Sequence, residues 1–399
     1  MKPPIAKPPQ YWQAIFSTGL ALFAMFFGAG NMIYPLELGV KSGSALLWSA
    51  LGFLVSGVGV PFIGLYAIAL FKGNYWNFFS TLGRIPAWIM IMFLMIIIGP
   101  LFAVPRTEIL VFNTLNPYME QAGIAISAAH FSKIYFGILF LLAYKESNVM
   151  DIIGNILSPI KVLSFGFLIG AAFYLAPAYQ ALDLSAGVAF KSGIDAGYST
   201  MDLLGAFFFG SVAYHAVKNK LNQEENSEKL AIKMLLKSSV VGAVLLCLIY
   251  LGFMLAAHRH AQTLGSEKIE ALIGFIGKSV LGNKGGLIMG LCVAVACFAT
   301  ALALINVFSH YLFNTLFKQK LPKLLCLAIT ILIAYNMSLL DFSVLQHYLG
   351  EILNVCYPAL IVFSVLSIVH KHVNLKAFQI SVPVLGTAIL AYVFQNFLA

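Results

Sequence analysis

A hydrophobic run near the N-terminus contains residues that cannot sustain a regular helix. Residues 12–38 are apolar over a length that crosses a bilayer, yet the sequence FGAGN at residues 27–31 places two glycines and an asparagine in its middle. Because Gly and Asn are poor helix formers, we expect the helix to break there. At membrane depth a broken backbone is tolerated only where protein or a water-filled cavity satisfies its freed amides and carbonyls. The break therefore predicts a binding site within the membrane.

Composition extends the membrane interpretation to the whole chain. Hydrophobic residues make up 60% of the sequence and charged residues 10%, and the mean hydropathy is +0.90, well outside the range of soluble domains. The formal net charge of +9 does not indicate a nucleic-acid partner, because the lysines lie in short loops between apolar runs. The five cysteines lie within apolar runs without metal-ligand spacing. We therefore predict no cofactor.

The apolar runs predict an all-α polytopic membrane protein with about eleven transmembrane helices, or twelve. A single transmembrane domain is expected over residues 12–399, preceded by a cytoplasmic tail at residues 1–11. A cleaved signal peptide is the alternative for the N-terminus, but no small-residue cleavage site followed by a polar start is present. The predicted segments are residues 12–38, 45–71, 85–115, 131–144, 152–176, 198–217, 232–257, 287–317, 321–340, 345–369 and 378–398.

A second interruption lies in the sixth segment, where residues 197–210 read GYSTMDLLGAFFFG. Glycines and an acid again interrupt an apolar run. Because the two broken segments, 1 and 6, lie five segments apart, the second half enters the membrane in the opposite sense, as in an inverted repeat. We expect the first repeat at about residues 12–176, the second at about 197–370, and an extra C-terminal helix at 378–398. The excess of Lys and Arg in alternate loops predicts a cytoplasmic N-terminus.

Four sequence blocks stand out along the chain. They are FGAGN at 27–31 with Pro35, GPLFA at 99–103 with PRT at 105–107, GN at 154–155 with Pro159 and Lys161, and GY at 197–198 with TMD at 200–202 and LGA at 204–206. These blocks resemble the signatures of the bacterial branched-chain amino acid:cation symporters. The resemblance covers nearly the whole chain and implies a LeuT-like fold of five-plus-five inverted repeats in a bacterial inner membrane. It also implies import of leucine, isoleucine and valine by symport with Na⁺, or alternatively H⁺, through alternating access.

Two features depart from this family pattern. Such proteins usually have twelve spans, whereas about eleven are predicted here. Glu108 follows Arg106 and Thr107 where a small residue is expected, which could alter local electrostatics or substrate preference. Arg106 itself is interpreted as a gating or structural residue and not as a substrate contact.

A zwitterionic amino acid needs a partner for its carboxylate, its ammonium and its side chain. Gly28, Ala29 and Gly30 are predicted to offer backbone amides to the carboxylate, helped by the positive end of the following half-helix; close helix packing is the alternative role of these small residues. Phe26, Phe27, Phe207 and Phe208 lie next to the breaks and are candidates for an apolar wall, or for ordinary packing. Asp202 is expected to attract the ammonium, to neutralise a cation, to carry a proton, or to pair structurally.

Sodium is a hard cation that prefers oxygen ligands. Asn31 in the first break and Thr200 in the second are the predicted Na⁺ ligands, on their chemistry and on the LeuT-like pattern. Thr300, in the eighth segment, is a further candidate because the resemblance places hydroxyls there; a threonine bonded back to its own helix is the alternative.

Other function classes find less support in the sequence. A membrane enzyme would need a nucleophile, base or metal cluster near an interface, and the chain shows no such constellation. A channel would show repeated filter residues or a polar stripe along several helices. Proton-coupled transport of another apolar amino acid remains the main alternative. The expected partners are thus a small amino acid, a coupling cation and the lipid bilayer.

Overall fold

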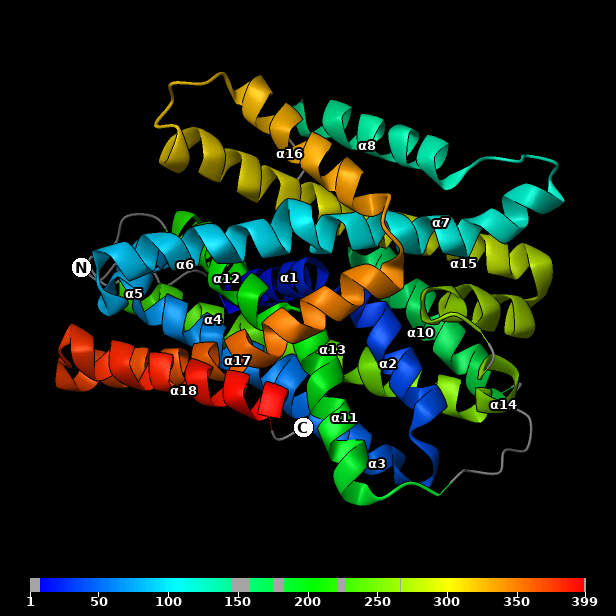
Figure 1. Cartoon of the computed structure of the whole chain (residues 1–399), viewed down its shortest axis with the longest axis horizontal. Coiled ribbons are helices and arrows are strands. Elements are labelled where there is room, and N and C mark those ends of the chain that lie inside the picture. The colour runs from blue at the N-terminus through cyan, green and yellow to red at the C-terminus, as the bar shows by residue number, and fades with distance from the viewer. Residues whose placement is uncertain (1–7, 145–157, 175–182, 222–226, 266, 398–399) are drawn as a thin grey trace.

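The computed structural model describes residues 8–144, 158–174, 183–221, 227–265 and 267–397, and these residues form helices without any strand. The all-α fold class is thereby confirmed. Most of the predicted N-terminal tail, and the motif residues Gly154 and Asn155, lie outside the described residues. Figure 1 shows a bundle of long helices, with α1 (Pro8–Phe26) near its centre.

Six helical runs are long and apolar enough to cross a membrane, or seven when the bent pair α1 and α2 (Ala29–Lys41) counts as one span. Three described apolar helices are shorter, at 10–17 residues. The predicted count of about eleven spans therefore stays a prediction. The six runs are Gly43–Leu70, Arg84–Gln121, Glu228–Arg259, Ile269–Leu316, Phe342–Val373 and Ala377–Asn396, and the three shorter helices are Ala128–Tyr144, Val162–Tyr174 and Lys323–Ser338.

The bounds of the individual helices show where the backbone departs from regular α-helical geometry. Gly43–Leu70 comprises α3 (Leu46–Leu54) and α4 (Val60–Leu70), joined by a π-helical turn at Val55–Gly59. After the short α5 (Tyr75–Phe79), α6 (Arg84–Ile96) and α7 (Ala103–Gln121) are joined at Ile97–Leu101, where Gly99 leaves helical geometry before Pro100. The remaining helices are α8 (Ala128–Tyr144), α10 (Ser158–Tyr174), α11 (Ala186–Ser199), α12 (Asp202–Lys220), α13 (Ser227–Arg259), α14 (Ala261–Leu264), α15 (Leu272–Tyr311), α16 (Lys323–Ser338), α17 (Phe342–Val373) and α18 (Ala377–Phe397).

The first predicted break is present between α1 and α2, which meet at 72°. Gly28 is extended, with φ −115° and ψ −162°, and serves as the N-cap of α2. The side-chain oxygen of Asn31 accepts a hydrogen bond from the Gly28 amide at 3.1 Å, as the third residue of a capping box does. The asparagine that weakens the continuous helix therefore also stabilises the start of the second half.

The second predicted break separates α11 from α12 at Thr200 and Met201. Met201 adopts the left-handed conformation, with φ +64° and ψ 17°. For a residue with a side chain this conformation costs about 1–2 kcal/mol, so surrounding contacts must hold it in place. Broken helices 1 and 6 are thus confirmed at positions within the predicted stretches.

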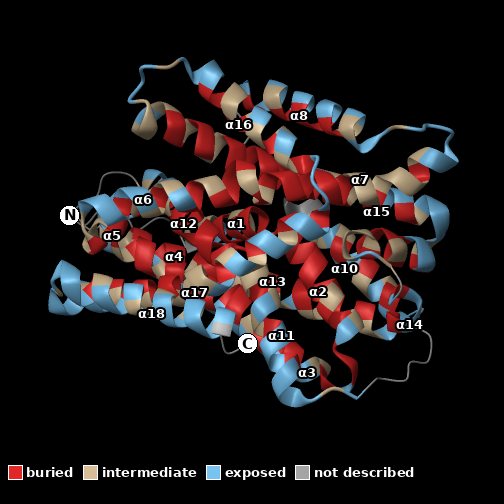
Figure 2. Ribbon diagram, viewed as in Figure 1, coloured by how far each residue is buried: buried red, intermediate tan, exposed pale blue. Residues whose placement is uncertain are grey.

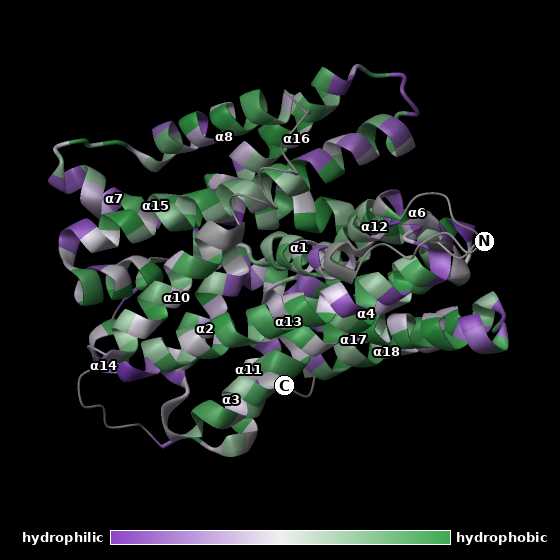
Figure 3. Ribbon diagram, turned by 180° about the vertical axis from the view of Figure 1, so that it is seen from behind, coloured by the Kyte–Doolittle hydropathy of each residue, from purple (hydrophilic) through white to green (hydrophobic). Residues whose placement is uncertain are grey.

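Burial divides the bundle into an enclosed centre and a lipid-facing exterior. Residues of α1, α2, α4 and α12 are largely buried (Figure 2), and α13 packs against α1, α2, α10 and α12. α8 and α16 lie at one side of the bundle, and α18 lies at the opposite side (Figure 1). The outer surface of α18 is apolar (Figure 3), with Leu385, Ile389, Leu390 and Phe394 exposed. Such an apolar exterior fits contact with hydrocarbon.

Candidate functional site

The two helix breaks meet at a small central cavity of about 40 Å³. This volume exceeds the roughly 10–15 Å³ that one water needs. Residues of both breaks line the cavity, together with side chains from α7, α12 and α15. The lining residues used below are Gly28, Ala29, Gly30 and Asn31 from the first break, Thr200, Met201 and Asp202 from the second, and Phe26, Ile98, Arg106, Thr107, Gly205, Phe209, Thr300 and Leu304.

Asn31 connects the two breaks directly. Its side-chain amide donates to Asp202 Oδ2 at 2.6 Å and to the hydroxyl of Tyr250 at 2.5 Å. The Tyr250 hydroxyl also donates to Asp202 Oδ2, at 3.4 Å. Both amide hydrogens of Asn31 are therefore used, and its oxygen retains one lone pair beyond the bond from Gly28. Because the carboxylate of Asp202 is buried, these donors reduce the cost of its charge.

Thr200 closes the end of α11 through its side chain. Its hydroxyl donates to the carbonyl of Gly197 at 2.8 Å and accepts from the Asp202 amide at 3.4 Å. The first break lies directly against this segment, because a Cβ added to Gly30 would lie 3.2 Å from Thr200 Cα. Glycine at position 30 thus allows the two broken backbones to touch.

Thr300, on α15, reaches the first break from another side. Its hydroxyl lies 3.4 Å from the carbonyl oxygen of Phe27 and 3.3 Å from that of Ala296. The hydroxyl can donate its one hydrogen to only one of these carbonyls at a time, and its oxygen keeps two lone pairs as an acceptor. One hydroxyl and two carbonyl oxygens form the type of neutral oxygen cluster that suits a hard monovalent cation.

Arg106 is a lining residue that the sequence analysis did not assign to the substrate. Its Nη1 donates to the Tyr34 hydroxyl at 2.9 Å and to the Ser199 carbonyl at 2.8 Å, and its guanidinium carbon lies 5.4 Å from the centre of the Tyr34 ring. Nε has no hydrogen-bond partner among the described residues. A Cβ added to Gly30 would lie 2.6 Å from Arg106 Nη2. The cavity therefore combines one buried cation with the buried acid Asp202.

Of the four phenylalanines predicted as an apolar wall, Phe26 lines the cavity, whereas Phe27, Phe207 and Phe208 do not. The ring of Phe27 stacks on Phe23 at 5.2 Å between centroids, and Phe207 packs against Phe78 at 5.3 Å. On α12 the cavity face carries Gly205 and Phe209, which are four residues apart and so share one side of the helix. Phe207 lies between them in sequence and therefore points away. Phe26 and Phe209, whose rings make an edge contact at 5.5 Å, form the aromatic wall, and Phe209 was not predicted.

Nothing in the sequence indicated that two tyrosines would lie at the site. Tyr250 of α13 bonds to Asn31 and Asp202 as described above, and Tyr357 of α17 accepts a hydrogen bond from the Leu203 amide at 3.2 Å. Each lies in a largely apolar stretch of its helix, a pattern equally typical of packing. Only the folded arrangement brings them to the start of α12.

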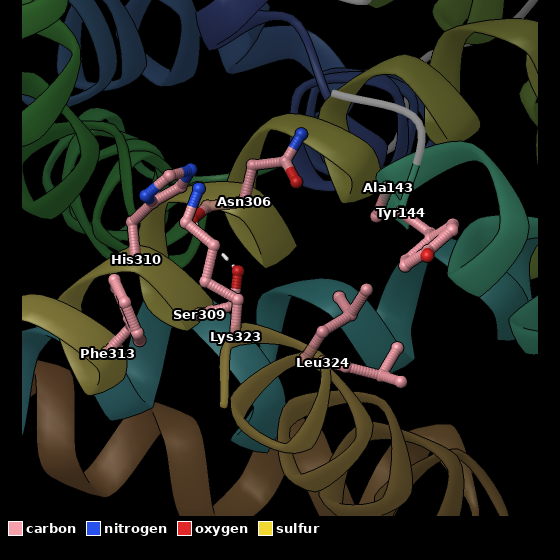
Figure 4. Close-up of a pocket in the computed structure, with 9 residues that line it drawn as sticks. Ala143, Tyr144, Asn306, Ser309, His310, Phe313, Lys323 and Leu324 are labelled. Carbon is pink, nitrogen blue, oxygen red and sulfur yellow. Dashed lines mark hydrogen bonds between the residues drawn. The ribbon is translucent and has the colours of Figure 1, made fainter. Parts of the chain in front are cut away.

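A second cavity, of about 100 Å³, lies at the ends of α8, α15 and α16. Figure 4 shows Asn306, Ser309 and His310 of α15 and Lys323 of α16 along it, with Tyr144 of α8 on the other side. It contains none of the break residues. Within the part of the chain that the structure describes, no group of three or more His, Cys, Asp or Glu is placed to hold a metal ion. We therefore take the central cavity, where both breaks meet beside the buried Arg106 and Asp202, as the candidate site.

Comparison with known proteins links this architecture to transport. A family model described as branched-chain amino acid transport protein matches residues 12–396. The chain is 31% identical over 361 residues to the branched-chain amino acid permease BraB of Bacillus subtilis (strain 168), covering 88% of this chain and 79% of the relative. It is 32% identical over 322 residues to the branched-chain amino acid permease BrnQ of the same strain, covering 78% and 72%.

Solved structures share the fold at low sequence identity. The inward-facing conformation of Mhp1 matches with a TM-score of 0.66 and 12% identity, covering 90% of this chain and 77% of Mhp1. The crystal structure of MhsT in complex with L-phenylalanine matches with a TM-score of 0.57 and 16% identity, covering 94% and 98%. The LeuT-like fold expected from the sequence is thus confirmed.

Proposed function

The chain belongs to the family of branched-chain amino acid transport proteins, and we propose that it imports leucine, isoleucine and valine by symport with Na⁺ across a bacterial inner membrane through alternating access. Its family is one of transporters and not of enzymes. The proposal rests on one observation above all. Two broken helices meet at a buried cavity that presents Asp202, Arg106 and free helix-terminal amides together.

The three parts of an amino acid find matching chemistry in this cavity. The first amides of α2, at Ala29 and Gly30, have no intrahelical acceptor and carry the positive end of the helix dipole, so they suit the substrate carboxylate. Arg106 adds a guanidinium on the same side, next to Gly30. Asp202 is the acidic partner for the ammonium group.

The side chain of the substrate would face the apolar part of the cavity. Phe26, Phe209, Ile98 and Leu304 provide this surface. Burying an aliphatic side chain of the size of valine or leucine contributes about 1.5–3 kcal/mol. The polar part of the cavity thus selects an amino acid, and the apolar part selects an aliphatic one.

Sodium is proposed to bind among the oxygens at the breaks. Thr300, with the carbonyls of Phe27 and Ala296, offers one neutral cluster, and the remaining lone pairs of Asn31 and Thr200 offer further ligands. A cation bound there would attract the carbonyl groups at the C-terminal ends of α1 and α11, which lack helical partners. It would thereby order both breaks. Ordering the breaks would raise the affinity for the amino acid, which is the coupling that symport requires.

The available driving force is sufficient for accumulation. One cation moving down ~100 mV releases about 2.3 kcal/mol, and a tenfold concentration ratio adds about 1.4 kcal/mol. The sum supports several-hundred-fold accumulation of a neutral zwitterion, by the rule of tenfold per 1.4 kcal/mol. With the N-terminus in the cytoplasm, as the loop lysines favour, the inward cation gradient drives import.

The test is uptake of labelled isoleucine into proteoliposomes, with and without an inward Na⁺ gradient, competed by each of the twenty amino acids. We expect saturable, Na⁺-driven uptake that leucine and valine block. Uptake driven by a pH gradient alone would establish proton coupling instead, and Asp202 would then be the first residue to replace. Failure of isoleucine with accumulation of another apolar amino acid would leave the fold intact and refute the specificity.

A further inference from the structure

A second buried acid, Glu108, lies in α7 outside the central cavity. It follows Thr107, which lines that cavity, but its own side chain is 2% exposed and lies outside the lining. Its Oε1 has no hydrogen-bond partner among the described residues. Acids buried at membrane depth are costly and are usually functional. The proposed transport mechanism assigns no role to this group.

Two serines from other helices surround the Glu108 carboxyl. The hydroxyls of Ser132 of α8 and Ser338 of α16 are close enough to it to interact with it electrostatically, and both serines are buried. The Ser338 hydroxyl lies 3.4 Å from that of Ser132 and 2.9 Å from the carbonyl of Tyr335. Glu108 thus sits at the junction of three helices, in a small polar cluster enclosed by apolar side chains.

No described basic residue neutralises this acid. Arg106, on the same helix, directs its guanidinium to Tyr34 and Ser199. On α8, Lys133 is exposed, and on α16, Lys323 is exposed at the opposite end from Ser338 and lies over the ring of Phe313. Tyr135 of α8, which interacts electrostatically with Glu108, and Cys297 of α15, which interacts with Tyr135, are ordinarily neutral. Among the other titratable groups of α7, α8 and α16, Glu120, His130 and Tyr144 are exposed, and Tyr118, Cys326 and Tyr335 are ordinarily neutral.

A polar connection links this cluster to the central cavity. The hydroxyl of Tyr135 donates to Thr107 Oγ1 at 3.0 Å, and Tyr135 is close enough to Glu108 for the two groups to interact electrostatically. Thr107 also lines the central cavity. The hydroxyls of Thr107 and Tyr135 therefore connect the cavity to the neighbourhood of the carboxyl.

We propose that Glu108, with Ser132 and Ser338, forms a proton-binding site that is separate from the cation site at the helix breaks. The bound proton converts the carboxylate into a carboxylic acid, whose O–H donates to a serine oxygen. Protonation removes the negative charge of Glu108, which no described basic residue compensates. The helices α7, α8 and α16 then pack around a neutral group. Ionisation requires water to enter this junction, so loss of the proton disfavours the packed arrangement. This inference rests on the proposed transport function and adds a pH dependence to it.

The ligand set favours a proton over a sodium ion. The cluster offers one carboxyl and two hydroxyls, and the hydroxyl of Ser338 also donates to the Tyr335 carbonyl. Hard metal cations usually take six or more oxygen ligands, and the helix breaks offer more of these from separate residues, namely Asn31, Thr200, Thr300 and the carbonyls of Phe27 and Ala296. A proton needs a single acceptor oxygen and one hydrogen-bond partner, which this site supplies.

The direct test is infrared difference spectroscopy of the full-length protein in lipid, comparing wild type with Glu108→Gln. At neutral pH we expect a protonated-carboxyl C=O band in wild type that is missing from E108Q, shifts in Ser132→Ala and disappears at alkaline pH. Glu120→Gln is the matched control, because Glu120 is an exposed glutamate on the same helix. Equal spectra of wild type and E108Q would overturn the proposal. So would a band that Na⁺ removes at constant pH, because the site would then hold sodium.

The functional test is the pH profile of isoleucine uptake. We expect wild-type uptake to fall by about tenfold per pH unit on the alkaline limb, as for loss of one proton, and uptake by E108Q to stay flat there because glutamine mimics the protonated acid. An unchanged pH profile in E108Q would refute the coupling. No uptake by wild type at any pH would refute the transport proposal instead, and the infrared result would still decide the proton site.

Discussion

Gly30 offers a stringent test of how the two helix breaks fit together. A Cβ at this position would lie 2.6 Å from Arg106 Nη2, 3.1 Å from Arg106 Cζ and 3.2 Å from Thr200 Cα. The guanidinium can move, but only by loosening its bonds to Tyr34 and Ser199. The Thr200 backbone cannot move without disturbing the left-handed Met201 beside it. Gly30→Ala therefore strains the conformation in which the breaks are in contact.

Overpacking of this kind costs about 1–3 kcal/mol. If the amino acid binds to the conformation with the breaks in contact, its apparent Kd rises as the population of that conformation falls. A cost of 1–3 kcal/mol corresponds to a roughly 5–150-fold change in affinity. We therefore expect Gly30→Ala to weaken isoleucine binding by about that factor, in the presence of saturating Na⁺.

The assay is equilibrium binding of labelled isoleucine to purified protein, with the melting temperature measured in parallel. Gly137→Ala is the matched control, because Gly137 lies in α8 and an added Cβ there meets no atom within 4 Å. The control should bind as wild type does. Wild-type affinity in Gly30→Ala, at wild-type stability, would show that close contact between the breaks is not needed for binding.

Four further substitutions test other parts of the site. Asn31→Ala removes both donors from Asn31 to the buried Asp202 and Tyr250 groups, so the melting temperature should fall, by an amount equivalent to about 1–3 kcal/mol; an unchanged value would contradict this role. Thr300→Val removes a hydroxyl at nearly constant volume, so the Na⁺ concentration for half-maximal uptake should rise while the isoleucine KM at saturating Na⁺ stays within about twofold. Phe209→Ala should raise the isoleucine KM, whereas Phe207→Ala should mainly lower stability, by about 3–5 kcal/mol; equal effects on KM would refute the assignment of the cavity face.

The positions of both breaks could be predicted from local sequence alone. Gly28 and Asn31 interrupt an apolar run, and the backbone does turn at Gly28, with the side chain of Asn31 capping the next helix. Such local features follow from residues a few positions apart, and they act in every fold that contains them. The all-helical class followed similarly, because in a bilayer the helix satisfies its own backbone polar groups.

The rotation of each helix about its axis was decided only by tertiary packing. From the sequence, Phe207 and Phe209 are equivalent members of a run of three phenylalanines. In the fold, Phe209 faces the cavity and Phe207 faces Phe78. The face that a helix presents depends on its neighbours, and residues 203–210 of α12 are apolar on all sides, so this stretch of sequence carries no preferred face.

The tertiary structure likewise decided which polar groups that lie far apart in sequence pair with one another. The sequence identified Asn31 and Asp202 separately, as break residues with their own chemistry, but not that one donates to the other at 2.6 Å. It gave no indication that Tyr250 would join them, or that Arg106 would reach Gly30. Local sequence determines where a helix stops, because the energies involved are local. Which buried polar groups satisfy one another depends on how the helices pack, since a partner must be found wherever the whole fold places it.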